Sequence, residues 1–596
     1  MSYDAIVVGT GFGASVAVSK LVERGQSVLV LERGTWWTTP ERLGKPPAPP
    51  PPDLPTWAAA TGQPVQYWPR PDHTDGLLDL FASVRWSGNV EGLYVLSQFD
   101  ECNIVSASGV GGGSLIYSTA TMQPDAAVLA QIGLTLTDAD YQAALDWTQT
   151  NRGLLSKIVT KFPLPDSKQV SDLGNEDYLY LDRSRALRDA AAVVKQRLNL
   201  GDGEAEWAPL DLAIHDYRES GPGNQEALRV HTFCERQGRC ILGCLPQATQ
   251  SLDKMLFDRY LADGSSGVTL WPLAEVRTIL SAAGGWEVTF RDHRADGQEQ
   301  TVTAPRVFLG AGTLGTNEIL LRSREAGLAL SDQIGQGFSN NGNFAGFCVG
   351  TAYPVNSTRG PMNTCHVNFQ LDGRHLIVED CAIPAMAAPL AAVALRLLDN
   401  PIKRELFKGA LRLAWMTKRI PDLGAFLSLI PDTRDPASYR TEAEAVADVF
   451  FFNAMGQDEA NGRFSLDGDE LDLKWDPPLT GQPVFAQIES LLIEISNAMA
   501  SSDPSSGYVP FPVWRGLGMH KLDVTHPLGG CRIAGDSSSG VVDEYGRVYD
   551  GAQPAGSAEV HPGLVLVDAS VSPGAVVAHP TLTIMAQALK TMTAAV

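Results

Sequence analysis

Apolar and polar positions along this chain form blocks whose periods are typical of strands and of helices. The first block, residues 4–34, contains the apolar run AIVV, a glycine-rich turn, a helical stretch and a second apolar run, VLVL. Apolar runs bounded by turn residues predict strands, and longer stretches with a helical period predict helices, so the chain reads as a mixed α/β protein. The other strands predicted in this way cover 268–290, 301–310 and 344–352, and the other helices cover 126–156, 183–198 and 388–430.

The turn in the first block has the composition of a nucleotide-binding loop. Gly9, Gly11 and Ala14 occupy the positions of the pattern G-x-G-x-x-G/A, and a helix begins near Gly13. Glycine permits the tight turn and a close approach of the backbone to a pyrophosphate, toward which the N–H groups of the helix point. Glu32 ends the second strand, where an acid accepts hydrogen bonds from an adenosine ribose. The block predicts a dinucleotide site, and the sequence ERG that begins at Glu32 is more typical of FAD-binding chains.

Composition and charge narrow the class of protein. A chain of 596 residues with 44% apolar and 19% charged residues suits a folded protein of more than one domain. Its net charge of −22 repels phosphate, so we expect no binding of nucleic acid. The chain enters its first strand without an apolar leader, and eight cysteines are too few for a disulfide scaffold. We therefore expect a cytoplasmic, reducing setting.

Two segments have an unusual composition. Residues 45–55 read KPPAPPPPDLP, and proline lacks the amide hydrogen that helix interiors and central strands need, so we expect an extended surface loop. In 390–420, basic residues alternate with leucine, phenylalanine and tryptophan. A helix of this kind either packs on its own domain or contacts a membrane or an apolar substrate.

Further motifs follow the first block in a fixed order. They are GVGGGSL at 109–115, GAGTLGT at 310–316, NNGN at 340–343, HPLGG at 526–530, and VDAS at 567–570 with HPTLTI at 579–584. Together with GTGFGA they resemble the glucose–methanol–choline (GMC) family of FAD oxidoreductases, and within it the cholesterol-oxidase-like branch. The middle of the chain, 350–510, is largely unmatched.

The resemblance implies the GMC fold, with a Rossmann-like FAD-binding lobe and a substrate lobe built on a mostly antiparallel sheet. The FAD-binding domain would be assembled from 1–40, 225–345 and 525–596, with a flavin-contacting loop at 106–118. The substrate-binding domain would comprise 41–224 and 346–524.

The resemblance also implies which residues hold FAD. The ADP half would lie against Gly9, Gly11, Phe12, Gly13, Ala14, Glu32 and Arg33, with the backbone of Val276 at the adenine. The isoalloxazine would be lined by Gly109, Gly111, Gly112, Gly113, Ser114 and Tyr117, the last of which replaces an asparagine of some relatives. Asp568 would lie near the ribityl chain or the pyrophosphate, and the set is completed by Gly310, Ala311, Ala569, His579, Pro580 and Thr581.

Family chemistry implies that a base removes the proton of an alcohol while hydride passes to flavin N5. His526 of HPLGG is the expected base, since an imidazole titrates near neutral pH, and His579 is its expected partner. Sugar-oxidising relatives carry histidine at the second position and cholesterol oxidases carry asparagine, so the choice of base between the two stays open. Glu379 stands where cholesterol oxidases carry a glutamate that moves a proton during steroid isomerisation; a structural carboxylate is the alternative.

Three cysteines are concentrated in CERQGRCILGC, residues 234–244. A disulfide between two of these cysteines would leave the third thiol unpaired. Zinc would need a fourth ligand, and His231 would give the pattern H-x2-C-x5-C-x3-C, which is not a usual zinc spacing. Three thiolates suit a three-iron 3Fe-4S cluster, and the spacing of Cys234, Cys240 and Cys244 resembles the iron–sulfur loop of bacterial FAD-linked glucose dehydrogenases. The alternative is the plain cysteine-bearing loop of cholesterol-oxidase-like proteins.

The leading hypothesis is an FAD-dependent oxidoreductase that oxidises the CH–OH group of an apolar, steroid- or terpenoid-like alcohol. Oxygen or an electron-transfer protein would be the electron acceptor. One alternative is a sugar or polyol dehydrogenase with a three-iron relay to a partner protein. A non-redox GMC-fold lyase is the other.

Overall fold

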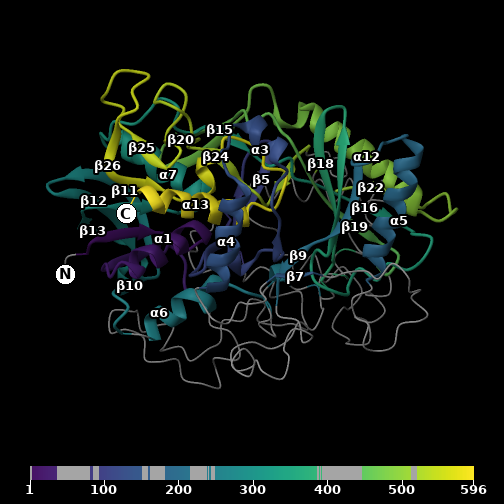
Figure 1. Cartoon of the computed structure of the whole chain (residues 1–596), viewed down its shortest axis with the longest axis horizontal. Helices are drawn as coiled ribbons and strands as arrows, with labels where there is room; N and C mark the ends of the chain where they lie inside the picture. The colour runs from purple at the N-terminus through teal and green to yellow at the C-terminus, as the bar shows by residue number, and fades with distance from the viewer. Residues whose placement is uncertain are drawn as a thin grey trace.

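The computed structural model of the chain is shown in Figure 1. It describes residues 3–36, 81–84, 93–150, 159–161, 181–214, 238, 240–242, 244, 249–262, 264–384, 388, 391, 446–511, 514 and 520–595. The proline-rich segment 45–55, Cys234 and His231 lie outside the described residues, as does the predicted helix 388–430 apart from residues 388 and 391.

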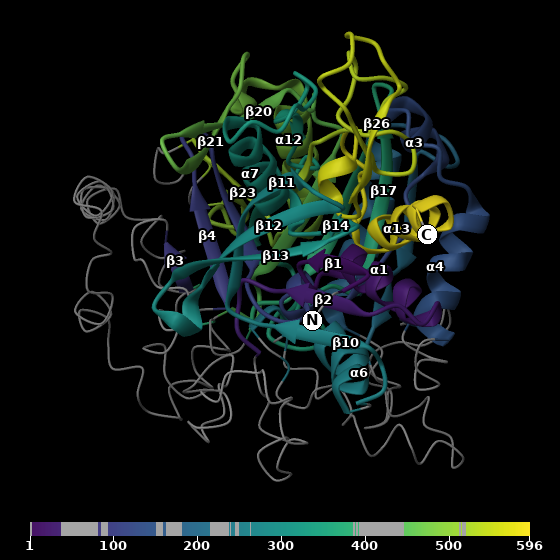
Figure 2. The ribbon, with the colours of Figure 1, turned by 90° about the vertical axis from the view of Figure 1, so that its left-hand side faces the viewer.

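A six-stranded sheet, with the order β10-β2-β1-β14-β26-β25, forms the half of the molecule that holds both termini (Figures 1 and 2). Its strands pair in parallel except β25, which is antiparallel to β26. Parallel strands need a crossover connection, and α1 provides it between β1 and β2. The elements are β1 (Ala5–Val8), α1 (Phe12–Glu23), β2 (Val28–Leu31), β10 (Val268–Trp271), β14 (Val307–Leu309), β25 (Arg547–Tyr549) and β26 (Val560–Leu566).

Both faces of this sheet are covered, which explains its continuous apolar strands. Ile6 and Val8 belong to the core cluster shared with a three-stranded antiparallel sheet, β11-β12-β13. Ala5 and Val7 belong to the cluster that contains the apolar sides of α1 and α13. These covering elements are β11 (Ala274–Ala282), β12 (Gly285–Asp292), β13 (Gln298–Ala304) and α13 (Thr581–Ala595).

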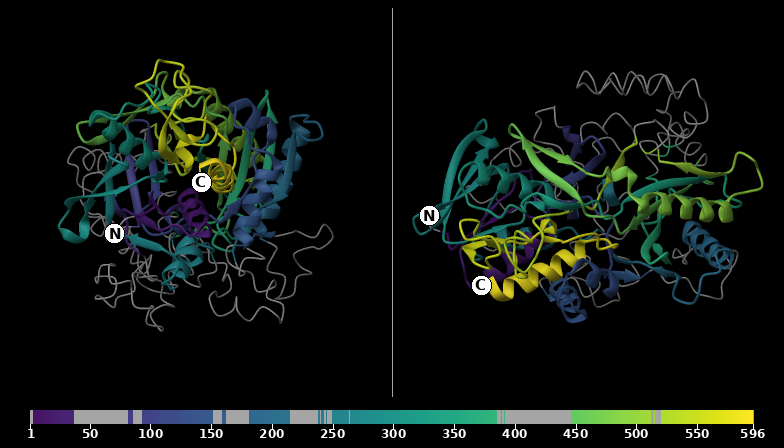
Figure 3. Two further views of the ribbon diagram at one scale, coloured as in Figure 1. Left: turned by 60° about the vertical axis from the view of Figure 1, so that its left-hand side comes forward. Right: turned by 90° about the horizontal axis from the view of Figure 1, so that it is seen from above.

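A second six-stranded sheet, β22-β16-β19-β18-β17-β8, is antiparallel throughout. Helices α5 and α12 lie on its outer face, and its other face turns toward the middle of the molecule (Figures 1 and 3). Side chains of a strand alternate between the two faces, so Glu379 and Ile377 of β18 face inward and Asp380 faces the helices. The elements are α5 (Asp182–Arg197), β8 (Ala205–Pro209), β16 (Phe344–Val349), β17 (Cys365–Leu371), β18 (Arg374–Cys381), β19 (Phe450–Gly456), α12 (Pro483–Met499) and β22 (Gly507–Pro510).

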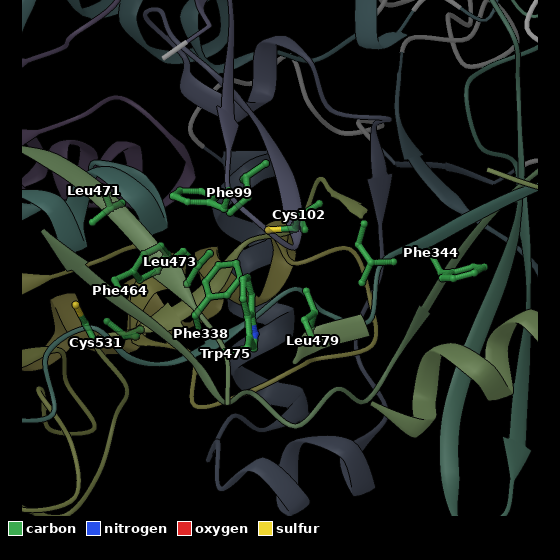
Figure 4. Packing of buried hydrophobic residues seen from close by; sticks show 14 of the residues in the cluster. Phe99, Cys102, Phe338, Phe344, Phe464, Leu471, Leu473, Trp475, Leu479 and Cys531 are labelled. Carbon is green, nitrogen blue, oxygen red and sulfur yellow. The ribbon is translucent and has the colours of Figure 1, made fainter. Parts of the chain in front are cut away.

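A four-stranded sheet has the order β21-β20-β15-β24. Figure 4 shows its apolar packing, in which the ring of Phe338 lies 5.0 Å from that of Phe464 and 5.7 Å from that of Trp475. These rings fix β15 immediately before the NNGN turn at 340–343. The elements are β15 (Gln336–Ser339), β20 (Gly462–Asp467), β21 (Glu470–Lys474) and β24 (Leu528–Gly530).

The other described elements include two smaller sheets and four helices. Two smaller sheets have the orders β23-β5-β4-β3 and β6-β9-β7. Their strands are β3 (Phe81–Val84), β4 (Tyr94–Gln98), β5 (Cys102–Ala107), β6 (Ala120–Thr121), β7 (Val159–Lys161), β9 (Asp211–Ala213) and β23 (Leu522–Val524), and the remaining helices are α3 (Ala126–Ile132), α4 (Asp138–Thr150), α6 (Asp258–Ala262) and α7 (Gly312–Glu325).

The mixed α/β class is confirmed, with one large sheet that is parallel apart from β25 and one large sheet that is antiparallel. The predicted helix at 126–156 is two helices, because Gly133 adopts a left-handed φ of 76° and ends α3 before α4 begins. The domain boundaries stay a prediction; the four-stranded sheet takes strands from both predicted domains. Within the described ranges, no helix combines the length and the hydropathy that a membrane span requires.

Candidate active site

The glycines of the first turn hold it against the carboxyl ends of neighbouring strands. A Cβ atom at Gly9 would lie 2.3 Å from the carbonyl oxygen of Gly310, and one at Gly13 would lie 1.5 Å from that of Val567. Gly11 differs, because a Cβ atom there would meet no atom of the described residues within 4 Å. The packing of the protein thus requires Gly9 and Gly13 but leaves space beside Gly11, where a ligand's phosphate can approach the backbone.

Thr10 joins this turn to the second glycine loop. Its hydroxyl donates to Oε2 of Glu32 over 2.6 Å and accepts from the N–H of Gly111 over 2.9 Å. Oε1 of Glu32 accepts from the N–H of Gly34 over 2.8 Å. Burial raises the pKa of Glu32, and the bonds from Thr10 and Gly34 oppose that shift. A carboxylate can accept about four hydrogen bonds, so Glu32 can still accept one from a ribose hydroxyl.

The second glycine loop lies against a segment rich in buried polar atoms. Leu252 N–H donates to the hydroxyl of Ser114 over 2.9 Å, and a Cβ atom at Gly111 would lie 3.1 Å from the amide nitrogen of Asp253. Both carboxylate oxygens of Asp253 are buried and lack a hydrogen-bond partner among the described residues. An added Cβ atom at Gly113 meets none of the described atoms within 4 Å. Open space beside unsatisfied polar atoms fits a cofactor with a polar edge, as FAD has.

The other predicted FAD contacts lie around these two loops. Those that follow β2, β14 and β26 share one edge of the parallel sheet, because the carboxyl ends of parallel strands meet there, and such folds bind nucleotides at that edge. Phe12 and Ala14 are in the first turn of α1, Arg33 follows β2, Val276 is in β11, Gly310 and Ala311 lie between β14 and α7, Ala569 follows β26, and Pro580 and Thr581 begin α13. Their contacts with the cofactor stay predictions.

Asp568 and Tyr117 are both positioned by protein contacts. Asp568 accepts from the N–H of Gly312 over 2.9 Å and from the hydroxyl of Thr316 over 2.5 Å, so it ties the end of β26 to the start of α7. Burial raises its pKa despite these bonds. Tyr117 donates to the carbonyl oxygen of Gln250 over 2.7 Å, and burial raises its pKa. Its hydroxyl is therefore engaged by the protein.

The two predicted catalytic histidines come together. His526 follows β23 and His579 precedes α13, and their rings are 4.9 Å apart between centroids with an interplanar angle of 80°. Burial, and then the neighbouring His579, lower the pKa of His526 well below its ordinary value. The pair therefore contains one imidazole that resists protonation.

Asn343, the last residue of NNGN, holds His526. Its Oδ1 accepts from the backbone N–H groups of Thr525 over 3.0 Å and His526 over 2.9 Å. Its Nδ2 lies 2.9 Å from Nδ1 of His526. Asn343 is only 2% exposed, so these contacts occupy its amide within the core.

Asn341 of the same motif holds the segment that carries His579. Its Oδ1 accepts from the N–H of Val577 and its Nδ2 donates to the carbonyl oxygen of Ala578, both over 2.9 Å. Asn341 and Val577 both have positive φ angles, of 58° and 51°. Sequence reasoning gave these two asparagines no role, although the motif itself was the available signal.

Glu379 contacts His579 directly. Nε2 of His579 lies 2.8 Å from Oε1 and 3.0 Å from Oε2 of the carboxylate. Asn363 and Asn453 each donate an amide hydrogen to Oε2, over 3.0 and 2.8 Å. Glu379 is completely buried, and the residue after it, Asp380, forms a buried ion pair with Arg183 over 2.7 Å on the opposite face of the sheet. The asparagines around Glu379 carried no sequence signal.

The cysteine segment is only partly described. Cys240 packs in an apolar cluster with Met362, Cys381 and Ala382. Among the described residues, no group of three or more His, Cys, Asp or Glu side chains could hold a metal ion. Because Cys234 is not among them, the three-iron cluster stays a prediction.

The fold combines a parallel sheet that has a glycine-rich first turn with an antiparallel sheet, and two histidines whose rings lie 4.9 Å apart mark the candidate site. Residues 492–588 match the family described as GMC oxidoreductase. In this segment the chain is similar to GMC oxidoreductases, and in sequence it is similar to cholesterol oxidases.

Cholesterol oxidases are the curated relatives in question. That of Mycobacterium tuberculosis is 26% identical over 351 residues, which are 56% of this chain and 50% of the relative. The match thus spans half the length of that protein. The cholesterol oxidase of Acinetobacter baumannii is 21% identical over 99% of this chain and 94% of its own length. Pyridoxine 4-oxidase from Mesorbium loti has the same fold, with a TM-score of 0.58, 13% identity and 99% of each chain covered.

Proposed function

We propose that this protein is an FAD-dependent oxidoreductase that oxidises the CH–OH group of an alcohol. The observation that carries the proposal is the His526–His579 pair, whose ring centroids are 4.9 Å apart. Asn343 contacts the ring of His526, and Glu379 contacts the ring of His579. Two imidazoles at this separation can both reach the hydroxyl of one carbinol, to hold it and to take its proton.

FAD fits the glycine loops. The open space beside Gly11 and Gly113 and the unsatisfied carboxylate of Asp253 support its binding there. The residues proposed to hold the ADP half are those of the first turn with Glu32, and those proposed for the ring are 109–114. When bound, the flavin supplies the hydride acceptor.

An apolar, steroid- or terpenoid-like substrate is the finer part of the proposal. It is supported by aromatic residues on the inward face of the antiparallel sheet. Phe451 is two residues before Asn453 in β19 and therefore points to the same face, and Asn453 is the hydrogen-bond partner of Glu379. Phe347 stacks on Phe451 with centroids 4.8 Å apart, and Phe511 lies 5.9 Å from Phe347. The names of the curated relatives support the same class.

A polyol or sugar is the second candidate, and a polar pocket favours it. The pocket has a volume of about 240 Å³ and lies on the same sheet face, on the other side of Glu379 from the aromatic residues. Its polar lining includes Asp125, Asp211, His366, Asn368 and His375.

Purified protein tests the proposal. We expect flavin absorbance at one FAD per chain, and turnover of sterols above that of polyols with oxygen or an artificial dye as acceptor. Turnover of polyols alone would favour the second candidate, and iron with labile sulfide would establish the predicted iron–sulfur cluster. A preparation that neither contains nor accepts FAD would reject the function altogether.

A further inference from the structure

We propose that the two histidines have different and fixed roles: His526 donates a hydrogen bond to the substrate oxygen from Nε2, and His579, backed by Glu379, accepts the hydroxyl proton at Nδ1. The inference rests on the proposed function and deepens it. It replaces the sequence-based expectation that the histidine of HPLGG is the base.

The first argument is the orientation of the Asn343 amide. Its Oδ1 accepts from two backbone N–H groups, at Thr525 and His526, and an N–H group can only donate. The oxygen is therefore identified, and the atom 2.9 Å from Nδ1 of His526 must be the NH2 group. An amide nitrogen donates and does not accept, so Nδ1 of His526 must be the acceptor.

A neutral imidazole carries one hydrogen, so an acceptor at Nδ1 places that hydrogen on Nε2. To act as a base at Nε2, His526 would first need its only hydrogen on Nδ1, and after taking the proton it would carry hydrogens on both nitrogens. In both states Nδ1–H would face the NH2 group of Asn343. Burial and the adjacent His579 also disfavour the charged ring. His526 is thus arranged to donate to an oxygen and not to take a proton from it.

The second argument is the environment of His579. Its Nε2 faces both oxygens of Glu379, at 2.8 and 3.0 Å, and Oε2 also receives amide hydrogens from Asn363 and Asn453. An ionised carboxylate accepts only, so Nε2 of His579 carries the hydrogen and Nδ1 carries the lone pair. The positive charge that His579 gains on protonation would lie against the carboxylate, as in catalytic triads.

The step balances as follows. The O–H bond of the alcohol breaks and its proton goes to Nδ1 of His579, while the carbinol C–H bond breaks and hydride passes to oxidised flavin. The carbon–oxygen double bond forms from the electrons of the O–H bond. The hydrogen bond from His526 Nε2 stabilises the negative charge that develops on oxygen. Asn343 and Glu379 act through the histidines and are positioning residues.

Asn343→Asp tests the inference because it retains the acceptor for both backbone contacts, replaces the NH2 group that faces Nδ1 with a carboxylate oxygen, and adds one negative charge for which a control is needed. A carboxylate oxygen accepts, so His526 should carry its hydrogen on Nδ1 and lose the donor at Nε2. We would record long-range 1H–15N spectra of 15N-histidine-labelled holoenzyme, with the His526 signals assigned through His526→Gln. The wild type should show Nε2 protonated and Nδ1 bare, and the variant the reverse.

The same variant should lose about 10²–10³-fold in kcat, the usual effect of removing one oxyanion donor, with full flavin content. Asn368→Asp adds an equal charge at an exposed position of β17, and should leave the tautomer of His526 unchanged. Protonated Nδ1 in the wild type, or undiminished kcat in Asn343→Asp, would overturn the inference. Absence of any alcohol turnover in the wild type would instead reject the proposed function, since the tautomers are read without turnover.

Discussion

Glu379 and His579 are 200 positions apart in the sequence, and their side chains approach to 2.8 Å. The register of the antiparallel sheet creates this contact, because β18 pairs with β17 and β19 so that Glu379 lies opposite His366 on one side and Asn453 on the other. The Asn341 amide then holds the chain just before His579. The strand register and the Asn341 contacts thus position the carboxylate of Glu379 beside the imidazole of His579.

The first prediction concerns this carboxylate. Glu379→Gln keeps the shape of the side chain and removes the negative charge that stabilises a protonated His579. We expect kcat for the best alcohol to fall by about 10²–10⁴-fold, the range attributed to acid–base catalysis, with unchanged flavin absorbance. Glu379→Asp, which keeps the charge, should retain more activity than the glutamine variant. Steady-state kinetics provide the measurement, and equal activity of Gln and wild type would contradict a role for the charge.

The second prediction separates glycines needed by the fold from a glycine needed by a ligand. A methyl group at Gly13 would overlap the carbonyl oxygen of Val567, so Gly13→Ala should yield little folded protein. A methyl group at Gly11 meets no described atom within 4 Å, so Gly11→Ala should fold with a melting temperature close to that of the wild-type apoprotein. We expect it to bind FAD at least about tenfold more weakly, which corresponds to about 1.4 kcal/mol. Fluorescence titration measures the affinity, and wild-type affinity would place the phosphates elsewhere.

The sequence predicted the first strand–helix–strand unit of the parallel sheet, since β1, the glycine turn, α1 and β2 are contiguous in residues 4–34. It also predicted the two histidines through their motifs. The partners of those histidines could not be derived in the same way, because they depend on sheet register and on which face each residue occupies. The sequence identified Asn343 only as a member of the NNGN motif. Its proposed function depends on the orientation of its side-chain amide, which two backbone N–H groups determine in the folded protein. Asn363 and Asn453 belong to no motif at all.

The third prediction concerns the ion pair behind the site. Arg183 and Asp380 are both fully buried, and Asp380 also accepts from the backbone N–H groups of Thr364 and Cys365 over 2.7 and 2.8 Å. Arg183→Leu leaves Asp380 without its cation, so we expect the free energy of unfolding to fall by about 3–5 kcal/mol.

A surface pair supplies the matched control for that variant. Lys20 and Glu23 are also 2.8 Å apart, but their side chains are 32% and 47% exposed. Lys20→Ala should therefore change stability by no more than about 1 kcal/mol. Urea unfolding followed by circular dichroism measures both variants, and similar losses in the two would refute the assigned importance of burial.

The fourth prediction is a pH dependence of stability that arises at His366. Burial lowers the pKa of this imidazole in the folded protein; the charges of Glu379 and Asp380 oppose that shift, and His579 adds to it. The polar pocket also brings Asp125, Asp211 and His375 toward it. Below about pH 6.5 the unfolded chain takes up a proton that the folded chain refuses, so the stabilisation present at higher pH is lost as the pH falls through this range.

His366→Gln removes that titration, and we therefore expect its free energy of unfolding to decline less between pH 7.5 and pH 5.5 than that of the wild type, by about 1.4 kcal/mol for each unit of pKa shift. The comparison is of slopes and not of absolute stabilities, because glutamine also changes the packing beside Glu379. His520, which is exposed, provides the control: His520→Gln should leave the slope unchanged. Urea unfolding at four pH values would measure it. A slope in His366→Gln as steep as that of the wild type would mean that the folded protein accommodates the charged ring, with the neighbouring carboxylates outweighing burial.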